Sequence, residues 1–222
     1  MRQFGPPCAE IAGVIYGSGL GSLIGCSLET LDRGLVSAFV ERWHIKTSSF
    51  HMPVGEMTIT LDDVSCLLHL PITGAFYTYE AIDTYAVVEK LVDLLGVAAF
   101  EARAETHQCR GPYIRLRWLR DVYQSRCAAL EWPQAARAYL LHLVGCTIFA
   151  NKSCAHTSVI WLDLFRDLDD CSTYCWGAAA LTHMYDQLNE ANIHGTKQLG
   201  GYVTLLQVLN VIDHNLMLFC FC

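Results

Sequence analysis

Apolar side chains recur along most of this chain at the three- or four-residue spacing of helices with one buried face. The stretch from Ala135 to Phe149 is apolar nearly all round, and Pro133 just before it suits the first turn of a helix. This stretch is therefore predicted to be the buried central helix. The same spacing predicts further helices over residues 31–43, 84–100, 114–130, 161–168 and 173–191.

The pattern also indicates which residues of these helices face the core. Two of them have a clear apolar side. In the helix 84–100 the inner residues are expected to be Tyr85, Val88, Leu91, Val92 and Leu95, and in 173–191 they are Leu181, Met184, Tyr185 and Leu188.

A convincing strand pattern occurs around a short connection that contains proline and glycine. Residues 49–52 and 56–60 flank Pro53-Val54-Gly55, which predicts a β-hairpin. Thr60 then has Asp63 three residues later, the spacing of a capping box at a helix start. The helix that follows should end before Pro71 and bury Val64, Leu67 and Leu68.

No low-complexity tract, charge block, proline-rich linker or internal repeat divides the chain. We therefore expect one mainly α domain of many helices with one small β-hairpin. Residues 151–158 are expected to form a polar loop, and 202–211 are compatible with either a helix or a strand.

Composition favours a large core or a surface that another chain covers, because 53% of the residues are apolar and 17% are charged. The uncharged run from Ile11 to Leu28 contains five glycines and has no flanking cluster of basic residues, so we do not expect it to span a membrane. The 11 cysteines are odd in number and scattered, which is typical of reduced core residues in an intracellular protein.

Candidate catalytic, cofactor and metal chemistry finds little support, and we predict none of the three. Cys171, Cys175 and His183 lack the paired spacing of zinc ligands, and no GxSxG or P-loop sequence occurs. Four carboxylates close together in sequence could serve a two-metal site, although a solvated face and a helix cap explain them more simply. They are Asp163, Asp167, Asp169 and Asp170.

Arginine supplies the one basic concentration of the chain, interleaved with Tyr113, Trp118 and Tyr123. Such a mixture can bind nucleic acid through charge and stacking, with Arg115, Arg117 and Arg120 as the candidate contacts. The formal net charge of -7 and nearby acidic residues favour a solvated helix face instead. The full set is Arg103, Arg110, Arg115, Arg117, Arg120 and Arg126.

Several phrases together resemble the plant mobile domain, a family that is also called aminotransferase-like. They are LDRGLVSAFVERWH (31–44), SFHMPVGEMTITLDDVSCLLHLPITG (49–74), RAYLLHLVGCTIFANKS (137–153) and DLDDCSTYCWGAAALTHMYDQL (167–188). The resemblance covers residues 16–207 in order. It leaves 1–15 as an N-terminal extension and 208–222 as a divergent tail, where family members continue and this domain is expected to be truncated.

The resemblance implies a non-enzymatic nuclear interaction domain concerned with transposon silencing, gene expression and meristem maintenance, with a phosphatase-7-like protein as partner. The sequence lacks the metallophosphatase motifs GDxHG, GDxxDRG and GNHE, and no lysine has a context suited to a pyridoxal Schiff base. The partner surface is expected on the hairpin, because hairpins expose strand edges. Its residues are Phe50, His51, Pro53, Gly55 and Glu56. The alternative is a transposon-derived nucleic-acid-binding module that uses the arginine-rich helix 114–130.

Overall fold

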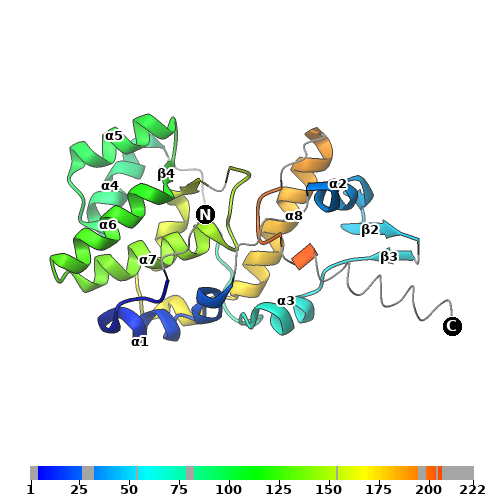
Figure 1. The fold of residues 1–222 in the computed structure, drawn as a ribbon, viewed down its shortest axis with the longest axis horizontal. Helices are drawn as coiled ribbons and strands as arrows, with labels where there is room; N and C mark the ends of the chain where they lie inside the picture. Colours follow the sequence, from blue (N-terminus) through cyan, green and yellow to red (C-terminus); the bar gives the residue numbers. More distant parts are fainter. Residues whose placement is uncertain are drawn as a thin grey trace.

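A computed structural model describes residues 5–26, 33–53, 55–78, 83–153, 155–194, 199–203 and 205–206. Helices dominate it, as predicted, and Figure 1 shows them arranged along one long axis with the hairpin at one end and α4–α6 at the other. The helices are α1 (Ala9–Gly17), α2 (Arg33–Arg42), α3 (Leu61–Leu68), α4 (Thr84–Leu95), α5 (Ala99–Cys109), α6 (Leu116–Ala128), α7 (Trp132–Cys146) and α8 (Trp176–His194), with short 3-10 helices η1 (Gly21–Gly25), η2 (Val159–Phe165) and η3 (Asp170–Thr173).

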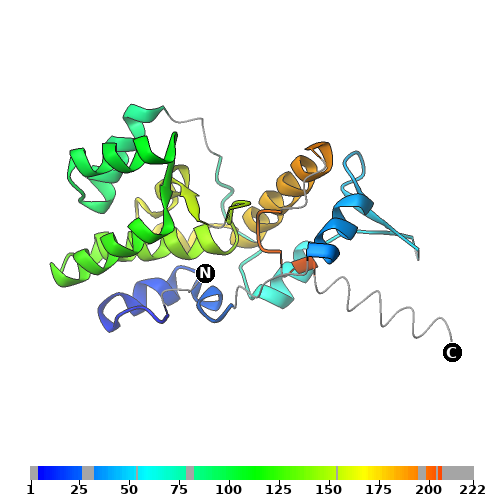
Figure 2. The same ribbon diagram turned by 45° about the horizontal axis from the view of Figure 1, so that its top comes forward.

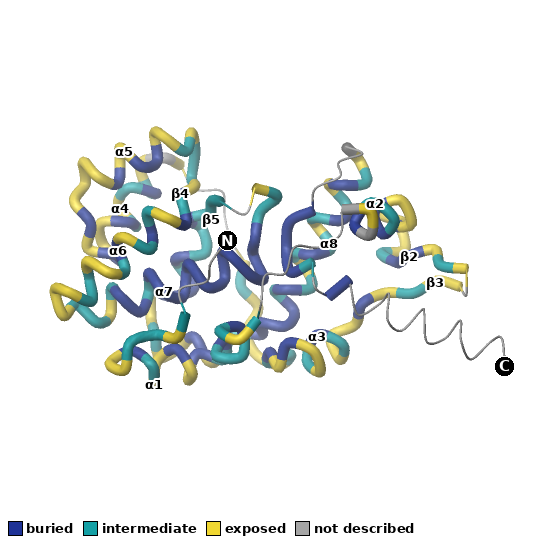
Figure 3. Tube along the Cα trace, in the orientation of Figure 1, coloured by how far each residue is buried: buried dark blue, intermediate teal, exposed yellow. Residues whose placement is uncertain are grey.

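Helix α7 is the central element, as its apolar sequence predicts. All of its residues from Ala135 to Cys146 are buried except Arg137, and Pro133 lies in its first turn. Figure 3 shows this buried stretch in the middle of the molecule, with more exposed helices around it. Helix α1 contacts α7, and its residues Ile11 and Ile15 belong to the core of the domain.

The predicted hairpin forms and carries an additional strand. β2 (Ser49–Met52) and β3 (Gly55–Met57) are antiparallel, with Met52 paired to Gly55. β1 (Trp43–His44) pairs with the other edge of β2, so Trp43 lies in a strand and not at the end of the predicted helix. Figure 2 shows the hairpin projecting beyond α2 and α8. The capping box between Thr60 and Asp63 is confirmed.

A second small sheet joins segments that were expected to be helix and loop. β4 (Tyr113–Arg115) precedes α6, and it pairs antiparallel with β5 (His156–Ser158). The backbone groups of these segments are satisfied by pairing across the fold, which local spacing does not reveal. The predicted helix 161–168 is instead the 3-10 helix η2, and the long C-terminal helix starts at Trp176 rather than 173.

The predicted helix 84–100 is wrong as a single element. It ends at Leu95 because Gly96 adopts the left-handed conformation, at φ 69°, and its N–H donates to the carbonyl of Val92. The inner face of α4 also differs from the prediction. Leu91 and Leu95 are buried as predicted, but Tyr85 is 77% exposed and Val92 37%, and the buried side also includes Val87 and Leu94.

The inner faces predicted for α3 and α8 are confirmed in part. Val64 and Leu68 of α3 are buried but Leu67 is 39% exposed, and on α8 Met184 and Leu188 are fully buried. Among the described residues no helix is both long and apolar enough to cross a bilayer, and the run from Ile11 is divided between α1 and η1. Leu205 and Leu206 have helical backbone. The predictions for residue 31 and for residues 207–222 fall outside the described part.

Candidate functional site

The hairpin is built on a rigid base. Phe50 is fully buried and meets Phe39 and Trp43, with ring centroids 5.4 and 4.8 Å apart. Trp43 Nε1 donates to Asn189 Oδ1 of α8 at 2.8 Å, and Tyr185 Oη donates to the carbonyl of Ile59 at 2.7 Å. These contacts fasten both ends of the sheet to α2 and α8. Phe50 is therefore a core residue, and its predicted place in a partner surface is wrong.

The remaining hairpin candidates do lie at the surface. His51, Pro53, Gly55 and Glu56 are exposed, and His51 Nε2 lies 3.6 Å from Glu56 Oε1. Ser49 Oγ donates to Glu56 Oε2 at 3.2 Å, which orients the carboxylate across the sheet. β3 is an edge strand of the order β1-β2-β3 within the described residues, so its outer side offers backbone groups for pairing.

The three arginine candidates do not form one basic surface. Arg115 donates from its backbone N and its Nε to Glu105 Oε1, at 2.8 and 2.9 Å, so its charge is neutralised inside the molecule. Arg117 is exposed, whereas Arg120 is partly buried. Arg126, nearby on α6, pairs with Glu131. The predicted nucleic-acid patch therefore carries less positive charge than its sequence suggests, because Arg115 is neutralised by an ion pair with Glu105.

Two of the cysteine, histidine and aspartate candidates, Cys171 and Asp163, have partners within the fold, whereas Asp167, Asp169 and Asp170 are exposed, as expected of a solvated face. Cys171 is fully buried, its thiol donates to the carbonyls of Leu164 and Asp167, and burial raises its pKa to about 12. Asp163 is only 21% exposed and pairs with Lys90 and Arg166, so it is not part of a solvated face. No group of three or more potential metal ligands occurs among the described residues.

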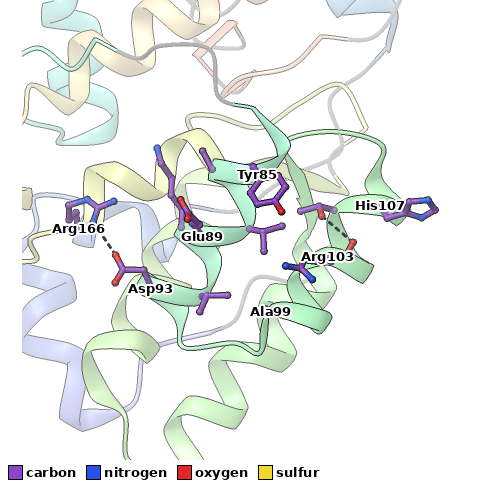
Figure 4. A pocket seen from close by; sticks show the side chains of 12 residues that line it. Tyr85, Glu89, Asp93, Ala99, Arg103, His107 and Arg166 are labelled. Atoms are coloured by element: carbon purple, nitrogen blue, oxygen red, sulfur yellow. Dashed lines mark hydrogen bonds and ion pairs between the residues drawn. The ribbon is translucent and has the colours of Figure 1, made fainter.

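A cleft between α4 and α5 is the feature that the sequence did not predict. It encloses about 980 Å³. Figure 4 shows Tyr85 and Glu89 contributed by α4 and Arg103 by α5, with the Arg166–Asp93 ion pair at one end. Its apolar wall includes Val88, Val92 and Ala99. Gly96 is the signal in the sequence, because glycine is favoured where helices end, and an end there divides residues 84–100 between α4 and α5, which line the cleft.

Charges in this cleft are partly satisfied by the protein itself. Lys90 pairs with Asp163, and Arg166 Nη1 lies 3.1 Å from Asp93 Oδ2. Arg103 and Glu89 form no ion pair with any other described residue. The cleft therefore keeps one positive and one negative side chain that no such pair neutralises. A concave, mixed surface with an exposed aromatic residue is suited to binding another molecule.

The fold and these surfaces define a mainly α domain with a small exposed sheet and a broad cleft between two helices. Residues 19–210 match the family model of the plant mobile domain, and the chain belongs to that family. No solved structure matches it significantly.

Curated relatives come from Arabidopsis thaliana. The chain is 38% identical to Protein MAIN-LIKE 2 over 199 residues, which are 86% of this chain and 28% of the relative. It is 35% identical to Protein MAINTENANCE OF MERISTEMS, over 84% of this chain and 38% of the relative. It is also 32% identical to the Serine/threonine-protein phosphatase 7 long form homolog, over 80% of this chain and 13% of the relative. The chain thus spans well under half of the length of these relatives.

Proposed function

We propose that this domain is a non-enzymatic protein-interaction module of the nucleus, and that its partner surface is the outer part of the β2–β3 hairpin. The proposal depends on the difference in burial between the base of the hairpin and its outer part. Its base is buried around Phe50, while His51 and Glu56 are half exposed beside the edge strand β3. An edge strand whose base is packed against the core is already paired on one side when a partner binds, which lowers the entropic cost of association.

The proposed partner is a phosphatase-7-like protein, and the proposed process is transposon silencing and gene regulation in meristems. Supporting this, one relative bears the name MAINTENANCE OF MERISTEMS and another is a phosphatase 7 long form homolog.

A binding experiment with the full chain tests the hairpin. Tagged protein would be expressed in plant cells, located by fluorescence, and recovered from nuclei for identification of bound proteins. Glu56→Lys should weaken recovery of a phosphatase-7-like protein about tenfold, because it reverses the charge on the exposed strand. Asp121→Lys is the matched control, since Asp121 is also an exposed carboxylate but lies on α6.

The cleft between α4 and α5 is the alternative partner surface within this domain. If Tyr85→Ala abolishes partner recovery and Glu56→Lys does not, the interaction surface lies between α4 and α5 and the hairpin proposal fails. Recovery of nucleic acid in place of protein, lost on Arg117→Ala, would instead favour the nucleic-acid-binding module. A purely cytoplasmic location would contradict the nuclear assignment.

A further inference from the structure

A smaller pocket lies where residues 75–77 and η2 meet the first half of α8. A parallel bridge between Ala75 and Tyr174 holds these segments together, with Ala75 N donating to the carbonyl of Thr173 at 2.8 Å. The pocket encloses about 110 Å³, which is several times the ~30 Å³ that one water occupies in the liquid. It can therefore hold a small head group. Its aromatic lining is Phe76, Tyr77, Phe149, Trp161, Tyr174 and Trp176.

Tyr174 meets two of the other lining rings at a steep angle. Tyr77 and Tyr174 lie at 82° to each other with centroids 6.4 Å apart, and Tyr174 lies at 71° to Trp176. Trp161 stacks on Phe149 at 4.1 Å, which holds the indole ring in place. Tyr77 is also fixed, because its hydroxyl donates to the carbonyl of Ile160 at 3.3 Å. The walls are thus formed before any ligand arrives.

The charge around this pocket is negative. Neither lysine nor arginine lines it, whereas Asp186 places an exposed carboxylate at its edge. His183 adds no positive charge at neutral pH, because burial lowers its pKa despite the Ala150 carbonyl and nearby acids. Burial raises the pKa of Tyr174, and Cys171, Asp170 and Asp163 raise it further, so the hydroxyl of Tyr174 stays neutral at neutral pH. Arg166 is the opposing cation near Tyr77.

We propose that this aromatic pocket binds a methylated ammonium group, through cation–π contact with its rings and attraction to Asp186. An anion would meet the Asp186 carboxylate, and no lysine or arginine is among the residues that line the pocket. An unmethylated ammonium ion is strongly hydrated and needs hydrogen-bond acceptors, which these walls largely lack, while a methylated one is apolar at its surface and still charged. The proposal goes beyond the interaction role assigned to the hairpin and uses different elements, so either can fail alone.

Choline and its neutral isostere, in which a tert-butyl group replaces the trimethylammonium group, test the charge requirement. Both would be titrated into the full chain and followed by calorimetry and by the NMR shift of the ligand methyl groups, which ring currents move upfield. Choline should bind about tenfold more tightly than the isostere, equivalent to ~1.4 kcal/mol. Equal affinity of the two ligands would overturn the proposal.

Two exposed positions test the site without threatening the fold. Asp186→Asn should weaken choline about threefold and leave the isostere unchanged, and Phe76→Ala should weaken choline by a similar factor. Phe100→Ala is the matched control, because Phe100 is 72% exposed, close to the 78% of Phe76, but lies on α5. Loss of binding in the control, or none in both pocket variants, would place the ligand elsewhere.

The source of the methylated group is resolved by peptides that differ only in one lysine. Tighter binding of a trimethyllysine peptide than of choline, with the unmethylated peptide inactive, identifies a modified protein as the ligand. Choline binding without peptide binding identifies a small metabolite. Absence of binding by both choline and the trimethyllysine peptide at millimolar concentration would refute the pocket's assignment.

Discussion

Glu105 is the residue at which burial and charge oppose each other most directly. Its side chain is 1% exposed, and burial alone would raise its pKa strongly. Hydrogen bonds from the side chain and backbone of Arg115 outweigh that effect, so the pKa is lowered overall. The carboxylate therefore remains charged inside the fold, and Arg115 has a structural role that its place in a basic stretch of sequence did not indicate.

Arg115→Ala should destabilise the protein because it leaves the buried carboxylate without its cation. Arg115 is itself 39% exposed, so the loss should fall below the ~3–5 kcal/mol seen for fully buried pairs, at about 2 kcal/mol. Urea unfolding would measure it. Arg117→Ala, two residues further along in α6, is the control, and a similar loss there would show that the effect does not depend on Glu105.

The lowered pKa of the buried His142 makes the stability of the protein depend on pH. Burial, with a smaller effect from Arg120, lowers its pKa from 6.5 to about 3. Between pH 6.5 and about 3 the imidazole therefore binds a proton in the unfolded chain but not in the folded one. The contribution of neutral His142 to stability is thus complete above pH 6.5 and is lost as the pH falls toward 3. The loss should reach roughly 4 kcal/mol at the acid end.

Unfolding in urea at a series of pH values would follow this loss. His142→Gln should flatten the dependence above pH ~5, where carboxylates with ordinary pKa values titrate little. Because His183 is shifted in the same direction, the slope should decrease without vanishing. An unchanged slope in the variant would refute the role of His142.

At the scale of elements, α7 and β5 are packed so closely that their contact requires a glycine. A Cβ built at Gly145 would lie 2.4 Å from Thr157 Oγ1 and 2.6 Å from its Cβ. Such distances are below van der Waals contact, so the strand could not keep its place against a larger residue. The close approach helps position β5 beside β4.

Gly145→Ala should therefore destabilise the protein by about 2 kcal/mol, despite the better helix propensity of alanine. Gly13→Ala is the matched control, because Gly13 also lies inside a helix but has nothing within 4 Å of the added Cβ. The control should gain ~0.5–1 kcal/mol in thermal or urea unfolding. A gain in both variants would show that α7 and β5 can separate at little cost.

The cap of α3 is an element boundary for which sequence and structure agree. Thr60 Oγ1 accepts from Asp63 N at 3.2 Å, while Asp63 Oδ2 accepts from Thr60 N at 2.8 Å. Thr60→Ala should cost about 1 kcal/mol in urea unfolding, because the N–H of Asp63 loses its acceptor at the helix end and the Asp63 carboxylate loses one donor. Thr60→Ser keeps the hydroxyl and should restore most of that loss. Equal losses in the two variants would mean that the methyl group, not the cap, matters.

At the scale of the whole molecule, charge argues against a broad nucleic-acid surface. The formal net charge is -7, and Arg115 and Arg126 are paired internally. Duplex DNA or RNA should therefore bind no more tightly than the nonspecific range of roughly 10⁻⁴ to 10⁻⁶ M at physiological salt. Fluorescence anisotropy over a salt series would measure this. Nanomolar affinity that decreases on Arg117→Ala would contradict the expectation.

Fold and site were predictable to different degrees. Local signals predicted α7, the hairpin and the α3 cap, because each depends on residues close in sequence. The spacing predicts the buried side of α4 correctly at Leu91 and Leu95 but not at Tyr85 and Val92, because these two line a cleft that another helix creates. Phe50 was assigned to a surface since its burial depends on Phe39 and Trp43, which only the folded sheet brings to it.

Sequence by itself determined the mainly helical class, the central helix, the hairpin and the family, because periodic apolar spacing, turn residues and motif order are properties of the chain alone. Tertiary structure decided which charges neutralise each other and where aromatic rings enclose a space. Glu105 with Arg115, and Tyr77 with Tyr174, meet through packing between separate segments. The spacing of residues along the chain does not predict such pairs, because their free energies depend on burial and on distances that exist only after folding.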